Sequence, residues 1–196
     1  MNRTDSNRWR TVDIVVASVI AVAFGVVFQL WNILWKGSDG PFAFFAPLQS
    51  VMYGVWLIPA VLSALIVRKP GAALLTETVA STVSVLLGSP YGAMAILQGA
   101  VQGLGVEAVF AATRYRLYRP LTAALAGACG GLFATLFDAL YWYPGTSWTT
   151  FRLPYIAFGV LSCLLVAGLG AVALTRALAN TGVLDRFPAG RDRALI

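Results

Sequence analysis

The sequence consists mainly of long apolar stretches separated by short links, and this pattern limits the folds that are open to the chain. A helix needs about 20 apolar residues to cross the hydrocarbon core of a bilayer. Only 11% of the 196 residues are charged, whereas soluble domains carry about 25%. We therefore predict an all-α polytopic membrane protein with six transmembrane helices, at about Val12–Trp35, Pro47–Val67, Gly71–Leu87, Tyr91–Thr113, Pro120–Trp142 and Leu153–Arg176.

Proline residues mark most of the predicted helix starts. Proline lacks a backbone N–H and has a fixed φ, so it is tolerated in the first turn of a helix. Five prolines fall at or just before a predicted start: Pro47, Pro70, Pro90, Pro120 and Pro154. Pro59 instead lies inside the second span, where we expect it to kink the helix and to leave backbone carbonyls for a neighbour or a ligand.

Basic residues are distributed unequally between the two sides of this predicted bundle. If the N-terminus is cytoplasmic, the outer segments contain only Lys36 and Arg152 of the 14 Lys and Arg residues. Cytoplasmic loops of membrane proteins carry an excess of Lys and Arg. We therefore place both termini in the cytoplasm, with these residues on the inner side: Arg3, Arg8, Arg10, Arg68, Lys69, Arg114, Arg116, Arg119, Arg176, Arg186, Arg191 and Arg193.

The two ends of the chain are interpreted differently. The apolar run that follows MNRTDSNRWR extends to Trp35, which is longer than the apolar region of about 7–15 residues in a signal peptide. We interpret it as a retained first span. Residues 1–180 are then one transmembrane domain embedded in the lipid bilayer, and residues 181–196 are a basic cytoplasmic tail that we expect to fray.

Several function classes are disfavoured by what the sequence lacks. The arginines lie between apolar spans and form no basic stripe, so nucleic-acid binding is not expected. There is no His, and Cys129 and Cys163 lie mid-span, so we expect no metal site and no cofactor. Nucleophilic catalysis needs an activated nucleophile beside a base, and no such group of residues is recognisable, so no catalytic residues are expected. No Gly-x-x-x-x-Gly-Lys-Ser/Thr loop is present to bind ATP.

The stretch from Gly88 to Phe110 carries two amides at membrane depth. Gln98 and Gln102 are four residues apart, so they share one face of the fourth span. Polar groups within a membrane are costly unless they face a cavity or a partner. We therefore predict that both bind a small polar molecule inside the bundle, although an interhelical hydrogen-bond seam is the alternative.

A second polar stripe follows the third span. Glu77, Ser81, Ser84 and Gly88 share one face, which must point into the bundle because lipid cannot hydrogen-bond to it. We assign Glu77 and Ser84 to the predicted binding site. The alternative is again a seam of hydrogen bonds between helices, each worth about 0.6 kcal/mol.

Aromatic residues gather toward the predicted outer face, where they form either an interfacial belt or the walls of a pocket. Rings in a pocket could stack on a flat ligand or hold a cation over their faces. Asp138, one turn before Trp142, is well placed to hold such a cation, or it is a helix-end carboxylate in contact with water. We assign these further residues to the predicted site: Asp138, Trp142, Trp31, Asn32 and Tyr53.

Two other features suggest contacts rather than ligand binding. Ala17, Ala21 and Gly25 recur every four residues in the first span, and small residues at this spacing let another helix approach closely. They serve either packing within the bundle or docking of a partner protein. Glu107 lies off the Gln98 face and toward Arg114 and Arg116, so we predict a structural ion pair.

Several segments resemble a known family. They are TVDIVVASVIAVAFGVVF (11–28), RKPGAALLTETVA (68–80), LLGSPYG (86–92) and QGAVQGLGVEAVF (98–110). They are similar to the YkoE family, whose members are substrate-binding S components of energy-coupling-factor (ECF) transporters. The resemblance covers most of the chain from Thr11 to about Tyr155.

The resemblance implies a function and a set of partners. It implies capture of thiamin or its hydroxymethylpyrimidine precursor from outside the cell, in the plasma membrane of a bacterium. Aromatic rings would sandwich the ligand, and carboxylates and amides would bind its polar edge. Ala17 and Ala21 would contact the transmembrane coupling subunit, and two ATPase subunits would complete the complex.

Two other functions remain open from the sequence. One is a small integral-membrane enzyme that acts on a lipid head group through Glu77, Glu107 and Asp138. The other is a structural membrane subunit in which the polar residues only join helices.

Overall fold

The computed structural model describes residues 8–191, and this part of the chain consists of helices joined by turns, with no β-strand. The longer helices are α2 (Thr11–Gly37), α4 (Gly54–Val67), α5 (Ala72–Leu86), α6 (Met94–Ala112), α7 (Pro120–Tyr141), α8 (Leu153–Ser162) and α9 (Gly170–Asn180). Shorter elements are α3 (Asp39–Phe42), a 3-10 helix (Ala46–Met52), π-helical segments (Trp148–Arg152 and Cys163–Leu169) and α10 (Pro188–Arg191). The all-α prediction is confirmed for this part of the chain, and Arg3 and Arg193 lie outside it.

Five helical segments are long and apolar enough to cross a bilayer: Thr11–Gly37, Ala46–Val67, Met94–Ala112, Pro120–Tyr141 and Trp148–Asn180. The predicted third span corresponds to α5, which is apolar but has only 15 residues. At 1.5 Å per residue, α5 is about 22 Å long, shorter than a hydrocarbon core of about 30 Å. Two glycines with positive φ flank it, Gly71 at 86° and Gly88 at 92°. A total of six spans, with α5 as one of them, therefore stays a prediction.

Proline positions agree with the helix starts. Pro47, Pro120 and Pro154 each lie at the first or second position of a helical segment. Pro59 lies inside α4, as predicted, and α4 continues past it to Val67. Pro59 therefore does not end the helix.

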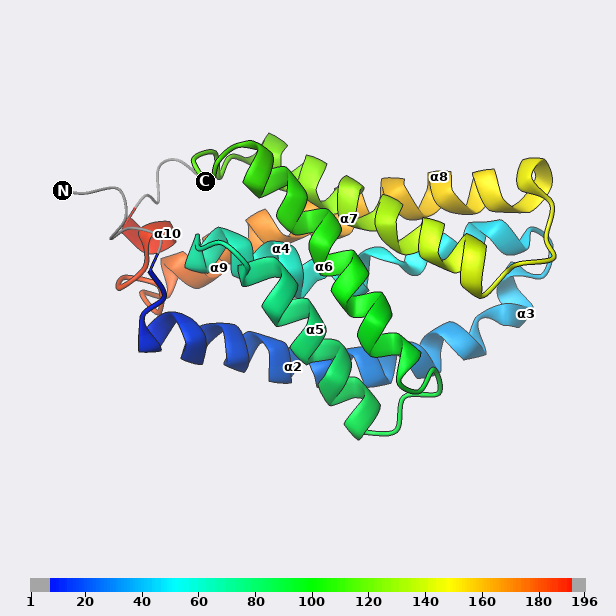
Figure 1. Ribbon diagram of the computed structural model, residues 1–196, viewed down its shortest axis with the longest axis horizontal. Coiled ribbons are helices and arrows are strands. Elements are labelled where there is room, and N and C mark those ends of the chain that lie inside the picture. Colours follow the sequence, from blue (N-terminus) through cyan, green and yellow to red (C-terminus); the bar gives the residue numbers. More distant parts are fainter. Residues whose placement is uncertain (1–7, 192–196) are drawn as a thin grey trace.

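The central element of the bundle is α4. Every residue from Pro59 to Val67 is buried, and α4 contacts α2, α5, α6, α7, α9 and the π-helical segment Cys163–Leu169. In Figure 1, α2 runs along one side of the molecule, α7 and α8 run along the opposite side, and α5 and α6 cross between them. The start of α2 lies at the same end as α10.

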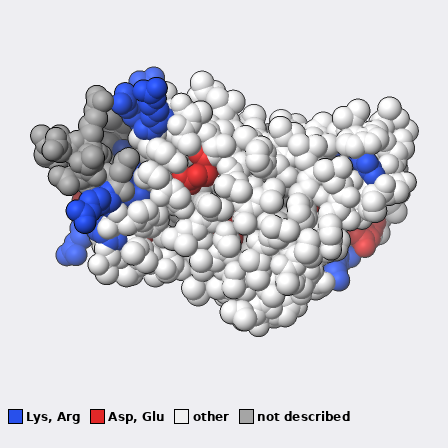
Figure 2. Space-filling view, in the orientation of Figure 1, with Lys and Arg blue, Asp and Glu red and all other residues white. Residues whose placement is uncertain are grey.

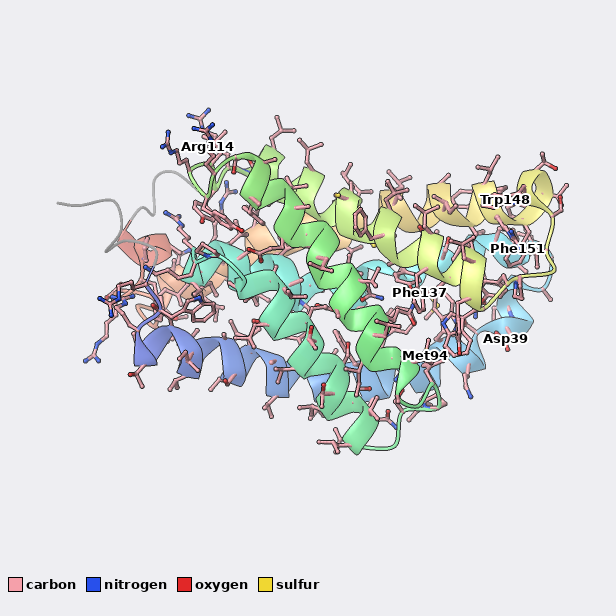
Figure 3. The ribbon with its side chains drawn as sticks, viewed as in Figure 1. Asp39, Met94, Arg114, Phe137, Trp148 and Phe151 are labelled. Carbon is pink, nitrogen blue, oxygen red and sulfur yellow. The ribbon has the colours of Figure 1, made fainter. Side chains whose placement is uncertain are left out.

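Charged residues gather toward the ends of the molecule. Figure 2 shows Lys and Arg clustered at the end where α2 begins, and few charged atoms across the wide middle of this face. Figure 3 places Arg114 at that end and Asp39 and Trp148 at the opposite end. An uncharged middle between two charged ends is the surface that a bilayer requires.

The small-residue stripe of α2 packs inside the bundle. Ala17 and Ala21 are fully buried, and Gly25 is buried against α5, where an added Cβ would lie 2.5 Å from the side chain of Val83. Of the two roles expected for Ala17, Ala21 and Gly25, the structure shows packing within the bundle, so their assignment to a partner interface is corrected. Their small size lets α5 approach α2, and the outer face of α2 carries other residues, such as Val19.

The carboxylate of Glu107 caps a helix instead of forming the predicted ion pair. It accepts hydrogen bonds from the backbone N–H groups of Gly71 (2.6 Å) and Ala73 (3.0 Å), at the start of α5. The first N–H groups of a helix lack partners within the helix, and the helix dipole favours negative charge there. Tyr115 Oη also donates to Glu107 at 2.8 Å. Burial and the Glu107 carboxylate raise the pKa of Tyr115 to about 12, so this phenol stays protonated at neutral pH.

The residues that follow Asn180 pack against the bundle, whereas we expected them to fray. Leu184, Phe187 and Ala189 are buried, and α10 packs against α4 and α9. These apolar side chains hold the described part of the predicted tail against the bundle, so residues 181–190 do not fray away from it.

The contact between α7 and the π-helical segment Cys163–Leu169 depends on glycine. An added Cβ at Gly168 would lie 2.5 Å from the Cα atom of Ala124, and one at Gly127 would lie 2.3 Å from the carbonyl oxygen of Cys163. These distances to backbone atoms leave no room for a methyl group, so the two backbones touch here.

We predict that Gly168→Ala destabilises the protein, because the helices must separate to admit the methyl group. Overpacking of this kind costs about 1–3 kcal/mol, which a lower melting temperature of the detergent-solubilised protein would report. Gly170→Ala is the matched control, since a Cβ there meets no atom within 4 Å. Equal melting temperatures for the two variants would contradict this account of the contact.

Candidate functional site

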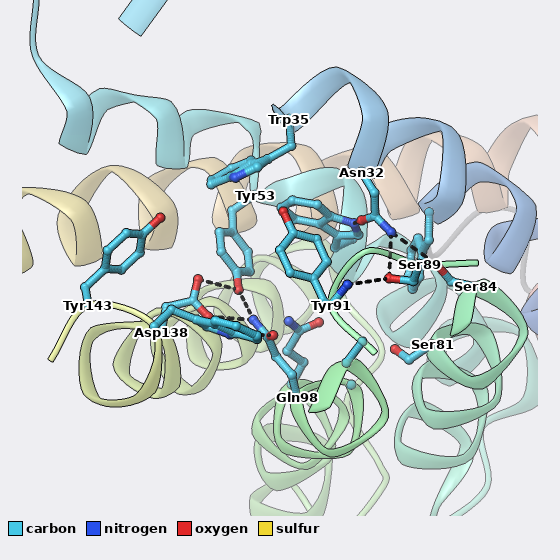
Figure 4. A pocket seen from close by; sticks show the side chains of 16 residues that line it. Asn32, Trp35, Tyr53, Ser81, Ser84, Ser89, Tyr91, Gln98, Asp138 and Tyr143 are labelled. Atoms are coloured by element: carbon cyan, nitrogen blue, oxygen red, sulfur yellow. Dashed lines mark hydrogen bonds between the residues drawn. The ribbon is translucent and has the colours of Figure 1, made fainter. Parts of the chain in front are cut away.

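A cavity of about 230 Å³ lies among α2, α4, α5, α6 and α7. It is shown in Figure 4. Its walls combine aromatic rings with amide, hydroxyl and carboxylate groups, as is typical of small-molecule sites. The lining residues are Phe28, Asn32, Trp35, Tyr53, Trp56, Ser81, Ser84, Ser89, Tyr91, Ala95, Gln98, Gly99, Gln102, Asp138, Trp142 and Tyr143.

Aromatic rings form two groups around this cavity. On one side, the ring of Trp35 lies 4.9 Å from that of Trp56 and 6.0 Å from that of Tyr53, between centroids. On another side, Tyr91 packs edge-on against Trp142 at 5.7 Å, and Lys36 Nζ lies 5.8 Å from the centre of the Tyr91 ring. A flat or cationic ligand would therefore contact ring faces and edges.

Asp138 is the carboxylate of the cavity, and three side chains donate hydrogen bonds to it. Tyr53 Oη and Tyr155 Oη donate to Oδ2 at 2.9 and 2.7 Å, and Gln98 Nε2 donates to Oδ1 at 2.6 Å. Trp142 Nε1 in turn donates to Gln98 Oε1 at 3.3 Å. Hydrogen bonds to a carboxylate are strong and stabilise its charged form. The Asp138 carboxylate is therefore a buried hydrogen-bond acceptor whose position is fixed by its three donors.

A second network surrounds Asn32. Its amide nitrogen donates to the hydroxyl oxygens of Ser84 and Ser89, both at 3.2 Å, and its oxygen accepts from Trp56 Nε1 at 3.2 Å. These contacts join α2, α4, α5 and the turn after α5, and Figure 4 shows Asn32 directed toward both serines. They fix this wall of the cavity.

The structure brings together seven of the nine residues that the sequence assigned to the site. They line the cavity: Asn32, Tyr53, Ser84, Gln98, Gln102, Asp138 and Trp142. Trp31 does not, because its ring turns away and Nε1 donates to the backbone oxygen of Met52 at 3.0 Å. Glu77 lies one turn before Ser81 on α5 and is fully buried outside the cavity lining, with neither carboxylate oxygen hydrogen-bonded among the described residues.

Comparisons with known proteins agree on one family. A protein family described as the permease component of an ABC-type cobalt transport system matches residues 12–133. YkoE of Bacillus subtilis (strain 168), named as an HMP/thiamine permease, is 38% identical over 188 residues, which cover 94% of this chain and 92% of that protein. The crystal structure of an S component of an ECF transporter matches with a TM-score of 0.88 and 37% identity, over 94% of this chain and 93% of that one.

The chain belongs to the YkoE family of ECF-transporter S components. The resemblance noted in the sequence is therefore confirmed. This S component is a membrane protein, and the relatives reported above are a permease protein and an S component of a transporter.

Sequence reasoning missed several residues that line the cavity of this S component: Phe28, Trp56, Ser89, Ala95 and Gly99. Helical spacing could have found some of them, since Phe28 lies four residues before Asn32 and Ala95 three residues before Gln98. Ser89 lies in a turn, where no periodic signal exists. The polar stripe of the third span did include Ser81, without assigning it to the site, and Trp35, Tyr91 and Tyr143 were not assigned to it either.

We predict that Tyr155→Phe destabilises this S component, because it removes one donor from the buried carboxylate of Asp138. A hydrogen bond to a charged group is worth about 1.5–3 kcal/mol, so the melting temperature in detergent should fall. Tyr141→Phe is the matched control, since Tyr141 is exposed and its hydroxyl has no hydrogen bond within residues 8–191. If both variants melt like the parent protein, the Asp138 network does not stabilise the fold.

Proposed function

We propose that this S component captures thiamin, or its hydroxymethylpyrimidine (HMP) precursor, in the cavity around Asp138. The name of the Bacillus relative supports this class of ligand. The observation that carries the proposal is one buried carboxylate surrounded by aromatic rings. No Lys or Arg among the described residues forms an ion pair with Asp138. The charge of Asp138 is therefore available to a cationic ligand.

A thiazolium ring fits these surroundings for two physical reasons. A cation over the face of a Trp or Tyr ring gains about 0.5–2 kcal/mol, the upper value when water is excluded. A carboxylate that already accepts three hydrogen bonds stays in place when the cation arrives, so little reorganisation is needed. The rings of Tyr53, Trp142 and Tyr143 line the cavity together with Asp138.

We further propose six spans, with both termini in the cytoplasm and the cavity facing outward. The distribution of Lys and Arg supports this orientation. The start of α2 and α10 lie at one end of the molecule, as an even number of spans requires, and Arg114 lies at the same end (Figure 3). In this orientation α5 spans a locally thinned bilayer or one partly filled by its neighbours.

The partners that we propose are a transmembrane coupling subunit and two ATPase subunits. The family of S components supports an ECF assembly. The chain contains no loop of the type that binds ATP in P-loop proteins, so the energy would come from other subunits. Because Ala17, Ala21 and Gly25 pack against α5, the coupling subunit would contact other residues of this S component.

The alternative functions receive less support. An enzyme that uses Glu77, Glu107 and Asp138 would need these acids at one site, but Glu107 caps α5 and Glu77 lies outside the cavity lining. A cobalt ligand set is also disfavoured, because the sequence has no His and the described residues contain no group of three potential metal-binding side chains. An aromatic cavity favours an organic ligand over a bare metal ion.

We predict saturable quenching of tryptophan fluorescence when purified protein is titrated with thiamin, because Trp35, Trp56 and Trp142 line the cavity. Asp138→Asn should weaken thiamin binding by roughly 10- to 100-fold, which corresponds to about 1.4–2.8 kcal/mol. HMP lacks the thiazolium charge, so its affinity should fall less.

Glu77→Gln is the matched control, because it changes a buried carboxylate that does not line the cavity. Its thiamin affinity should stay close to that of the parent protein. Absence of quenching with both thiamin and HMP would overturn the proposed function. Equal losses in the two variants would remove Asp138 from its assigned role.

The orientation predicts where reporter fusions are active. Alkaline phosphatase, which folds only outside the cytoplasm, should be active when fused after Gly145 and inactive when fused after Arg116. The reverse pattern of activity would invert the proposed topology.

A further inference from the structure

Three amide side chains line the cavity, and two of them are fully occupied by other protein groups. The amide of Asn32 donates to Ser84 and Ser89 and accepts from Trp56. The amide of Gln98 donates to Tyr53 and Asp138 and accepts from Trp142. Both ends of each amide are therefore engaged, and these residues shape the cavity.

Gln102 is the third amide, and it differs from the other two. Its side chain lines the cavity and is 5% exposed, yet it makes no hydrogen bond with any residue in the range 8–191. Ser81 is in the same situation on the neighbouring helix, with a hydroxyl that has no protein partner in this range. The two lie close together, because Ser81 packs on Gly99, one turn before Gln102 on α6.

The unpaired amide of Gln102 indicates which chemical groups a ligand in the cavity would present to it. Leaving a buried polar group without a partner costs about 1–3 kcal/mol, and apolar surroundings increase the cost. The other two amides are saturated by protein groups, whereas the amide atoms of Gln102 are open to the cavity and are not among the fully enclosed polar atoms that lack a partner. The missing partner of Gln102 is therefore supplied from outside the chain.

The donor and acceptor pattern of Gln102 defines the chemistry of that partner. A primary amide presents an N–H donor beside a C=O acceptor, and it pairs in a bidentate manner with an amino group next to a ring nitrogen. A 4-aminopyrimidine ring has this edge. We infer that Gln102, assisted by Ser81, binds the aminopyrimidine edge of the ligand, so that the other end of the ligand faces Asp138. This inference rests on the proposed function.

The spacing along α6 agrees with this orientation. Gln98 touches Asp138, and Gln102 lies one turn farther along the same face, about 6 Å away at 1.5 Å per residue. The two recognition points are therefore adjacent but distinct. A ligand with a polar neutral ring joined through one carbon atom to a cationic ring can reach both of them at once.

The inference is tested by comparing thiamin with 4-deaminothiamin, in which a hydrogen atom replaces the 4-amino group. This change removes the donor that the Gln102 oxygen is expected to accept from, which no rotation of the amide can restore, and the cationic ring is unchanged. We expect the parent protein to bind thiamin about 5- to 150-fold more tightly than 4-deaminothiamin, because one hydrogen bond is lost and one acceptor is left unpaired. In Gln102→Ala this ratio should fall toward one, by calorimetric titration or fluorescence quenching.

Gln29→Ala is the control for the loss of a glutamine, because Gln29 lies outside the cavity lining and donates to the carbonyl oxygen of Gly88. It should keep the thiamin-to-4-deaminothiamin affinity ratio of the parent protein. Size-exclusion profiles and melting temperatures establish that both variants are folded.

The outcomes separate this inference from the proposed function. If the parent protein binds neither compound, the proposed function fails. If it binds thiamin but Gln102→Ala keeps the parent ratio, the proposed function stands and the inference is overturned; an ordered water then satisfies Gln102. A ratio near one in the parent protein also overturns the inference.

Discussion

The requirement that buried polar groups find partners determines how this bundle holds its site. Lipid tails are as apolar as leucine side chains, so apolar contact alone gives little reason for the helices to choose one arrangement. Asp138 of α7 accepts hydrogen bonds from Tyr53 at the start of α4, from Gln98 of α6 and from Tyr155 of α8. One carboxylate thus fixes the relative positions of four helices, and these helices or their ends carry Tyr53, Trp56 and Trp142 of the cavity lining.

Much of this arrangement is readable in the sequence, because both signals involved are local. Helix positions follow from apolar length and proline, and the structure starts α7 at Pro120, as predicted. The ligand-facing side of a helix follows from spacing, which correctly placed Gln98 and Gln102 on a common face of the cavity. Polar residues are rare in these spans, so each one stands out against its apolar neighbours.

The contacts that the sequence did not predict correctly depend on which helix packs against a given face. A single sequence does not contain that information. Small residues such as Ala17 and Ala21 allow close approach equally to a neighbour within the chain or to another subunit, and here the neighbour is α5. Glu107 has arginines nearby in sequence, but the start of α5 lies nearer in space. Glu77 shares the polar face of Ser84, yet it lies too deep along α5 to reach the cavity.

Helices α5 and α6 are held together both by hydrogen bonds and by close packing at glycine residues. Glu107 of α6 accepts hydrogen bonds from the first N–H groups of α5. Elsewhere in the contact, Gly99 and Gly103 let Ser81 and Leu74 approach so closely that an added Cβ would overlap them. Such a pair behaves as one stiff hairpin. The cavity wall that this pair carries, with Ser81, Ser84, Gln98 and Gln102, therefore keeps its shape.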